Sequence, residues 1–136
     1  MPRFSRNGAG SVINANECVT TAAAAINVAG ASSTVTGNAL APVGGEGVLI
    51  SAARATVSGN TVVSGTHGVR VGPTGSGASG SNSVVTGNTI TGCQFWGVNV
   101  TSGCVDAIVT GNNLVGNTSG GLTDAGTTTT AANNKP

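Results

Sequence analysis

A short motif, Val-x-Gly-Asn, recurs along the chain at intervals that few folds can accommodate. Successive motif asparagines are separated by 22, 22, 28 and 24 residues. Periods of about 20 to 50 residues are typical of solenoids and other repeat architectures. The asparagines are Asn16, in a degenerate first copy, Asn38, Asn60, Asn88 and Asn112. We therefore expect a stack of coils rather than a conventional globule.

A second motif, Gly-Val-x-apolar, begins eight or nine residues after most of these asparagines, as at Gly47, Gly68 and Gly97. Both runs are short, alternating, and rich in valine and threonine, which favours strands over helices. Because side chains alternate along a strand, equivalent valines such as Val35 and Val57 should form inward columns. The sequence predicts an all-β parallel β-helix of about five coils of 22–28 residues.

The strings TVSGNTV, VVTGNTI and IVTGNNL resemble the repeats of the right-handed parallel β-helices of the pectate-lyase-like class. The resemblance covers about residues 11 to 125. That class includes polysaccharide lyases, hydrolases, phage tailspikes, adhesins and virion proteins, so the resemblance indicates fold more than function. It implies a right-handed coil and, through the likeness to tailspikes and virion β-helices, a homotrimer.

The chain is long enough for one domain. We expect an N-terminal arm or cap over residues 1–10, a β-helix over 11–125, and a polar tail or degenerate last coil over 126–136. Within the last segment, residues 130–133 resemble a decayed sixth repeat, with Asn133 at 21 residues after Asn112.

The motif asparagines are interpreted as a structural ladder and not as ligand-binding residues. Asparagine tolerates the left-handed backbone of a sharp corner, and stacked side-chain amides can hydrogen-bond from coil to coil.

One predicted column carries bulky polar and aromatic side chains. Glu46, His67 and Trp96 each precede a strand glycine, so they should lie on successive coils, with Phe95 beside Trp96. Such a column could hold a sugar ring, but aromatic residues are also enriched at subunit interfaces, which is the favoured interpretation. Arg70 is expected to be a solvated outward residue or an interface salt-bridge partner.

Catalytic and metal chemistry are not predicted. No two of the four carboxylates share a column on adjacent coils, and Asp124 falls in a normally inward column. With one histidine and no Cys-x-x-Cys, no metal site or cofactor is expected. Cys18 should point inward; Cys93 and Cys104 could bridge, although reduced thiols are favoured. The carboxylates are Glu17, Glu46, Asp106 and Asp124.

Charge and targeting signals limit the partners and the location. Charged residues make up 7% of the chain and the net charge is +1, so binding to nucleic acid or to an anionic membrane is not expected. The first residues, MPRFSRNGAG, lack the apolar core of a signal peptide. We therefore expect synthesis in a host cytoplasm and a final location in a virion.

These features favour a non-catalytic structural protein of a phage particle, either a capsid decoration (cement) protein or a short spike, whose partners are two further copies and other virion proteins. One alternative is a glycan-binding or depolymerase fragment of a tailspike or adhesin. Another is an ice-binding protein, because Thr36, Ser58, Thr86 and Thr110 form a hydroxyl ladder. The flanking column, Thr34, Thr56, Val84 and Ile108, breaks its regularity.

Overall fold

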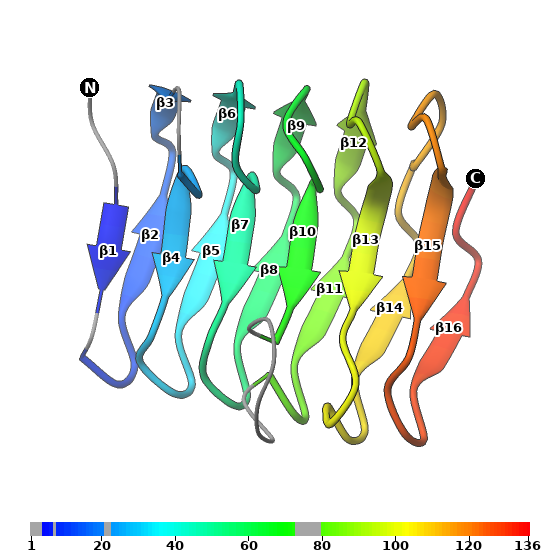
Figure 1. Cartoon of the computed structure of the whole chain (residues 1–136). Helices are drawn as coiled ribbons and strands as arrows, with labels where there is room; N and C mark the ends of the chain where they lie inside the picture. The colour runs from blue at the N-terminus through cyan, green and yellow to red at the C-terminus, as the bar shows by residue number, and fades with distance from the viewer. Residues whose placement is uncertain (1–3, 7, 21–22, 73–79) are drawn as a thin grey trace.

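The protein is a solenoid of short parallel strands stacked along one axis (Figure 1). A computed structural model describes residues 4–6, 8–20, 23–72 and 80–136. Every strand pair in this part of the chain is parallel, and the described residues contain no helix. Accordingly, this part of the chain has no helix that is long and apolar enough to cross a membrane. The predicted all-β parallel β-helix is confirmed.

The strands form three sheets, named A, B and C. Each coil contributes one strand to sheet A and one to sheet B, and the first four coils also contribute one to sheet C; neighbours in a sheet lie one coil apart in the sequence. Sheet A contains β1 (Phe4–Arg6), β4 (Ile26–Val28), β7 (Val48–Ile50), β10 (Val69–Val71), β13 (Trp96–Val100) and β15 (Gly120–Asp124). Sheet B contains β2 (Val12–Asn14), β5 (Thr34–Thr36), β8 (Thr56–Ser58), β11 (Val84–Thr86), β14 (Ile108–Thr110) and β16 (Thr130–Ala132). Sheet C contains β3 (Glu17–Thr20), β6 (Ala39–Pro42), β9 (Thr61–Val63) and β12 (Thr89–Thr91).

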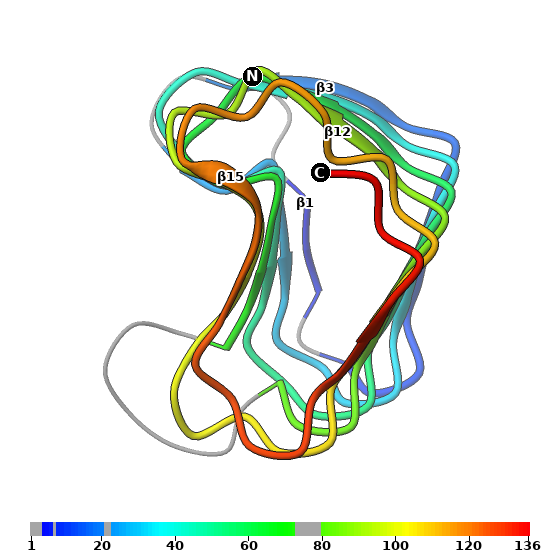
Figure 2. The ribbon, with the colours of Figure 1, turned by 90° about the vertical axis from the view of Figure 1, so that its right-hand side faces the viewer.

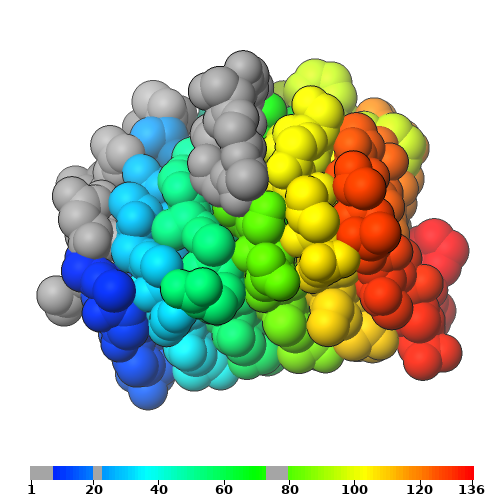
Figure 3. All heavy atoms as spheres, turned by 90° about the horizontal axis from the view of Figure 1, so that it is seen from below, coloured from blue at the N-terminus to red at the C-terminus, as the bar shows by residue number. Residues whose placement is uncertain are grey.

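Coils are numbered one to six from the N-terminus. Coils one to four hold three strands each, from β1, β2 and β3 to β10, β11 and β12. In coils five and six, isolated bridges at Asn113 and Lys135 continue the line of sheet C. The coils appear on the surface as successive bands (Figure 3).

The core is a set of aliphatic columns inside the coil. Val35, Val57, Val85 and Val109 are fully buried and lie in register across sheet B. Sheet C adds a second column, from Cys18 through Leu40 and Val62 to Ile90. Burying apolar side chains stabilises the stack by about 25 cal/mol per Å² removed from water, and valine and isoleucine also suit strands.

The motif asparagines form a continuous ladder at the corner between sheets B and C. The side-chain amide nitrogen of each donates to the Oδ1 of the next, at 2.9–3.0 Å from Asn16 to Asn134. Each of these Oδ1 atoms also accepts the backbone N–H of the preceding asparagine. The last member is Asn134. The sequence placed the asparagine of the sixth repeat at Asn133, which was wrong by one residue. Asn133 has φ 55° and takes the place that Gly111, φ 65°, has one coil earlier.

The strand glycines of the second motif are required by close packing across the coil. A Cβ on Gly68 would lie 2.1 Å from Ile90 Cγ2, and one on Gly47 would lie 2.6 Å from Val62 Cγ1. Sheet A therefore begins where its backbone touches the inner column of sheet C, and only glycine fits there.

The two ends of the stack are formed by β1 and by β15 with β16. β1 and β16, which lie outside residues 11–125, pair with β4 and β14. At the C-terminal end, Leu114 and Leu122 line a cavity of about 340 Å³ that also reaches Pro136. Asp124 was expected in an inward column, but it is exposed because its Oδ1 accepts hydrogen bonds from Gly126 N and Thr129 Oγ1. The last turn therefore draws this side chain out of the core.

Candidate binding face on sheet A

Glu46, His67 and Trp96 lie on successive coils at the start of sheet A. Gly47 N donates to His67 O at 3.0 Å, and Gly68 N donates to Trp96 O at 3.2 Å. In the next coil, Trp96 is in register with Gly120. In cross-section, the ribbon of sheet A curves toward the interior of the solenoid (Figure 2). We call the outer side of this sheet the aromatic face; its residues are Glu46, His67, Arg70, Phe95, Trp96 and Asn99.

Two aromatic rings of this face contact neighbouring coils. The ring of Phe95 stacks on that of His67, with centroids 5.6 Å apart and an interplanar angle of 29°. Phe95 is 49% exposed, so much of its ring remains open to solvent. The indole of Trp96 lies over Gly120, where a Cβ would come within 2.8 Å of Cζ3. Together the rings make an aromatic strip that crosses the coil boundaries.

An ion pair lies beside this strip. Arg70 Nη1 is 3.2 Å from Glu46 Oε1, and their side chains are only 15% and 17% exposed. Arg70 is therefore not the solvated outward residue of one expectation, because the guanidinium folds back to the carboxylate of the previous coil. Its role at a subunit interface stays a prediction. Arg70 Nε is buried without a hydrogen-bond partner among the described residues.

His67 occupies the centre of the face. Its Nε2 lies 3.2 Å from Asn99 Nδ2, and its Nδ1 is buried without a partner among the described residues. Burial lowers the pKa of His67 from its ordinary value of 6.5, and the positive charge of Arg70 lowers it further, while Glu46 acts in the opposite direction. When His67 is neutral and accepts from Asn99, its proton lies on Nδ1. Asn99 was missed by sequence reasoning, although the repeat aligns it with Arg70.

The carboxylates are distributed over the described structure without a catalytic pair. Glu17 lies on sheet C, Glu46 is bound to Arg70, and Asp106 and Asp124 lie in turns where they accept hydrogen bonds from nearby hydroxyl groups. Glycosidases need two carboxyl groups about 5 to 9.5 Å apart across the scissile bond. The aromatic face supplies one carboxylate, already in an ion pair, and so suits binding more than hydrolysis.

The potential metal ligands are also dispersed. The described residues contain no group of three or more His, Cys, Asp or Glu side chains placed to hold a metal ion. All three cysteines are buried, and none of them forms a disulfide. The bridge considered for Cys93 and Cys104 is therefore not formed. Burial raises the pKa of Cys93 to about 11, which disfavours the thiolate that copper binds.

Comparison with known proteins gives a family and no individual relative. No curated protein and no solved structure matches the chain. A model of the family described as periplasmic copper-binding protein (NosD) matches residues 4–134. The match supports the parallel β-helix but neither the pectate-lyase-like class nor the tailspikes. The family is periplasmic, so the predicted virion location is wrong; it rested on a fold that unrelated proteins share. Because the match spans nearly all of the sequence, this chain belongs to the NosD family.

Proposed function

We propose that this chain is a non-catalytic structural module that holds a protein partner on its aromatic face. The observation that carries the proposal is the half-exposed ring of Phe95, fixed by its stack on His67 and set beside Trp96. Aromatic residues are enriched in the cores of protein interfaces, where a rigid ring loses little entropy on binding. The solenoid core beneath supplies a stiff support.

The absence of catalysis is supported by the distribution of ionisable groups. The acid on the face, Glu46, is paired with Arg70, and the neighbouring coil offers no second carboxylate. His67 could move a proton, but its Nε2 faces the amide of Asn99 and its Nδ1 is buried. The family is named for copper binding and not for a reaction.

Copper binding, which the family name implies, does not fit the described residues. The only histidine faces an amide, and the thiols of Cys18, Cys93 and Cys104 are buried in the core or at its corners. Copper sites in proteins combine several imidazole, thiolate or thioether donors. We therefore base the binding role on aromatic and polar contacts, with no step through a metal.

A glycan is the second candidate partner. The amide of Asn99 and the guanidinium of Arg70 lie beside the aromatic strip, and Arg70 Nε and His67 Nδ1 have no hydrogen-bond partner among the described residues. Sugar hydroxyls could supply such acceptors after a small side-chain shift. Ice binding has less support, because one outward column of sheet B mixes Val12, Val84 and Ile108 with threonines. The homotrimer rested on the tailspike resemblance alone and stays a prediction.

Site-specific photo-crosslinking tests the proposal. A benzoylphenylalanine at position 95 should capture one defined protein from a periplasmic extract, whereas the same group at position 105 should not. Val105 is 39% exposed and lies outside the aromatic face, so it is a matched control. The captured protein, once purified, should bind the wild type and lose affinity at least about tenfold for Phe95→Ala. Equal labelling at both positions would contradict the proposal.

A glycan array separates the two partners. Binding of one glycan class that disappears in Phe95→Ala and Trp96→Ala, with no protein captured, would replace the protein partner by a glycan. A flat array together with no specific crosslink would remove the binding role from this face.

A further inference from the structure

The outer side of sheet C carries a column of exposed side chains with opposite charges at its two ends. The strand pairing of β3, β6, β9 and β12, continued by two bridges, places these residues in one line. In coil order they are Glu17, Ala39, Thr61, Thr89, Asn113 and Lys135, and all six are exposed. The carboxylate therefore lies on coil one and the ammonium on coil six, with uncharged residues between them.

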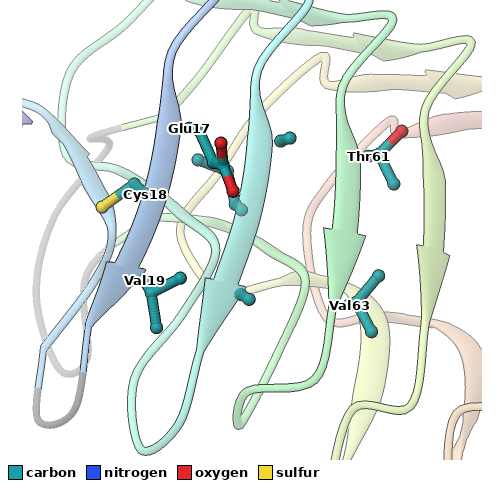
Figure 4. A pocket seen from close by; sticks show the side chains of 8 residues that line it. Glu17, Cys18, Val19, Thr61 and Val63 are labelled. Carbon is teal, nitrogen blue, oxygen red and sulfur yellow. The ribbon is translucent and has the colours of Figure 1, made fainter.

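A second column beside the first alternates larger and smaller side chains. Val19, Val63 and Val115, on coils one, three and five, are 43%, 48% and 42% exposed. Ala41 and Thr91, on coils two and four, lie between them. Figure 4 shows Val19 and Val63 on either side of the strand that carries the two alanines. A hollow of about 130 Å³ lies over Ala39 and Ala41. We call the two columns together the sheet C face.

We propose that the sheet C face binds the same face of a second copy of this chain, with the two stacks antiparallel. The two-fold axis runs along the strand direction, so coil one faces coil six, coil two faces coil five, and coil three faces coil four. Glu17 then lies opposite Lys135 of the second copy, and Lys135 opposite its Glu17. Both charged ends are matched by one rotation.

The same rotation also matches the shapes of the apolar column. It sets Val63 against Thr91 of the second copy, and Val115 against Ala41, so each of these valines faces a smaller side chain. A two-fold axis places valines opposite smaller side chains whenever it pairs an odd-numbered coil with an even-numbered one. The charge pairing selects one of these axes, because it requires coil one to face coil six. Charge and shape are independent features of the face, and they select one arrangement.

The other face-to-face two-fold, about the stack axis, is disfavoured. It would exchange the two columns and lay Glu17 of each copy over the valine column of the other. Covering a carboxylate with apolar groups and no cation costs free energy. Copies stacked in the same direction would bring each Glu17 near its own equivalent. Complementary charges thus fix the orientation of the pair, while the valines supply most of the attraction.

The size of the face sets the expected affinity. Six coils at about 4.8 Å and strands of about 13 Å give roughly 300–400 Å² per copy, below the 800 Å² or so of a standard interface. We therefore expect a weak, transient dimer that forms only at high protein concentration. Analytical ultracentrifugation over a concentration series should show a monomer–dimer equilibrium, weakened by salt. A monomer at every concentration, or a trimer, would overturn the proposal.

The apolar part of the contact is tested by Val63→Asp. This change should weaken the dimer at least about tenfold, because it places a carboxylate in the centre of the apolar column. Val105→Asp makes the same chemical change on another surface and should leave the dimer unchanged. Circular dichroism and thermal unfolding verify that both variants fold. Equal effects of the two variants would contradict the assignment of this face.

A charge exchange tests the antiparallel orientation. Glu17→Lys and Lys135→Glu should each weaken the self-association, because each puts like charges opposite one another twice. The double variant should regain the wild-type affinity. An equimolar mixture of the two single variants should form a heterodimer more readily than either forms a homodimer, since both contacts become complementary. Failure of both the double variant and the mixture to restore association would rule out this orientation. Phe95→Ala, on the aromatic face of sheet A, should not affect the dimer. The dimer proposal can therefore fail or succeed independently of the function proposed for the aromatic face.

Discussion

The side chains of His67 and Asn99 meet across one coil boundary, with Nε2 and Nδ2 separated by 3.2 Å. The same imidazole stacks on Phe95. The histidine is therefore enclosed from two sides by the following coil, which explains why burial is the largest cause of its lowered pKa. This contact couples the aromatic face to the stability of the stack.

We predict that stability decreases as the pH falls below the ordinary His67 pKa of 6.5. In that range the unfolded chain takes up a proton that the folded chain resists, so protonation favours unfolding until His67 in the fold also titrates. Urea unfolding at about pH 7.5 and about pH 5.5 measures the difference. His67→Gln should reduce it, and carboxylate titration common to both proteins cancels in the comparison. An unchanged pH dependence in the variant would assign the effect elsewhere.

Asn60 should be among the most sensitive positions in the ladder. Its Oδ1 accepts from Asn38, and its Nδ2 donates to Val35 O and to Asn88 Oδ1, all in a 1% exposed environment. Asn60→Ala leaves several buried groups unpaired, each costing about 1–3 kcal/mol, so we expect a loss of about 3 kcal/mol or more. Asn16→Ala, at the half-buried end of the ladder, should cost about 1 kcal/mol. Guanidinium unfolding checks both; equal losses would mean that burial does not set the cost.

Gly68→Ala should destabilise the fold by about 3 kcal/mol through overpacking. The added Cβ would lie 2.1 Å from Ile90 Cγ2 and 2.6 Å from Gly97 O, which belongs to the neighbouring coil. Gly87→Ala is the comparison, because nothing lies within 4 Å of its added Cβ and only its φ of 64° is unfavourable. That variant should lose about 1 kcal/mol. Thermal unfolding measures both, and a larger loss at Gly87 would show that backbone strain outweighs packing.

We predict that the purified chain retains no stoichiometric copper. The donors His67 and Cys93 are separately engaged, and the raised pKa of Cys93, about 11, keeps its thiol protonated. Incubation with Cu(I) or Cu(II), desalting and elemental analysis should find well under one equivalent. Native thiols should also react slowly with an alkylating reagent and rapidly in urea, because all three are buried. Retention of one equivalent of copper by the wild type, and its loss in His67→Ala or Cys93→Ser, would contradict this prediction.

The positions of the strands and of many outward side chains could be predicted from the repeat. A strand alternates its side chains between two faces, and a fixed period brings equivalent residues of successive coils into register. The repeat register alone therefore places Glu46, His67 and Trp96 in one column. Whether that column binds a partner stays a prediction.

The contacts made by those side chains could not be predicted in the same way. Arg70 turns toward Glu46 and not toward solvent, and Asp124 leaves its column to accept hydrogen bonds in a turn. Both choices depend on rotamers and on the neighbours that an adjacent coil presents. The backbone gives a further example. Arg54 adopts a left-handed conformation, φ 58°, at a corner where the sequence has neither glycine nor asparagine to indicate one.

The sequence by itself determined the parallel β-solenoid, because the period and the alternation of apolar residues specify which positions face inward and which coils are neighbours. Only the tertiary structure decided how side chains pair between coils: Arg70 with Glu46, His67 with Phe95 and Asn99, and Asn134 as the last member of the ladder. The physical reason is that a repeat encodes register along the stack. The direction of each long side chain, in contrast, depends on the packing and hydrogen bonds available after the coils have come together.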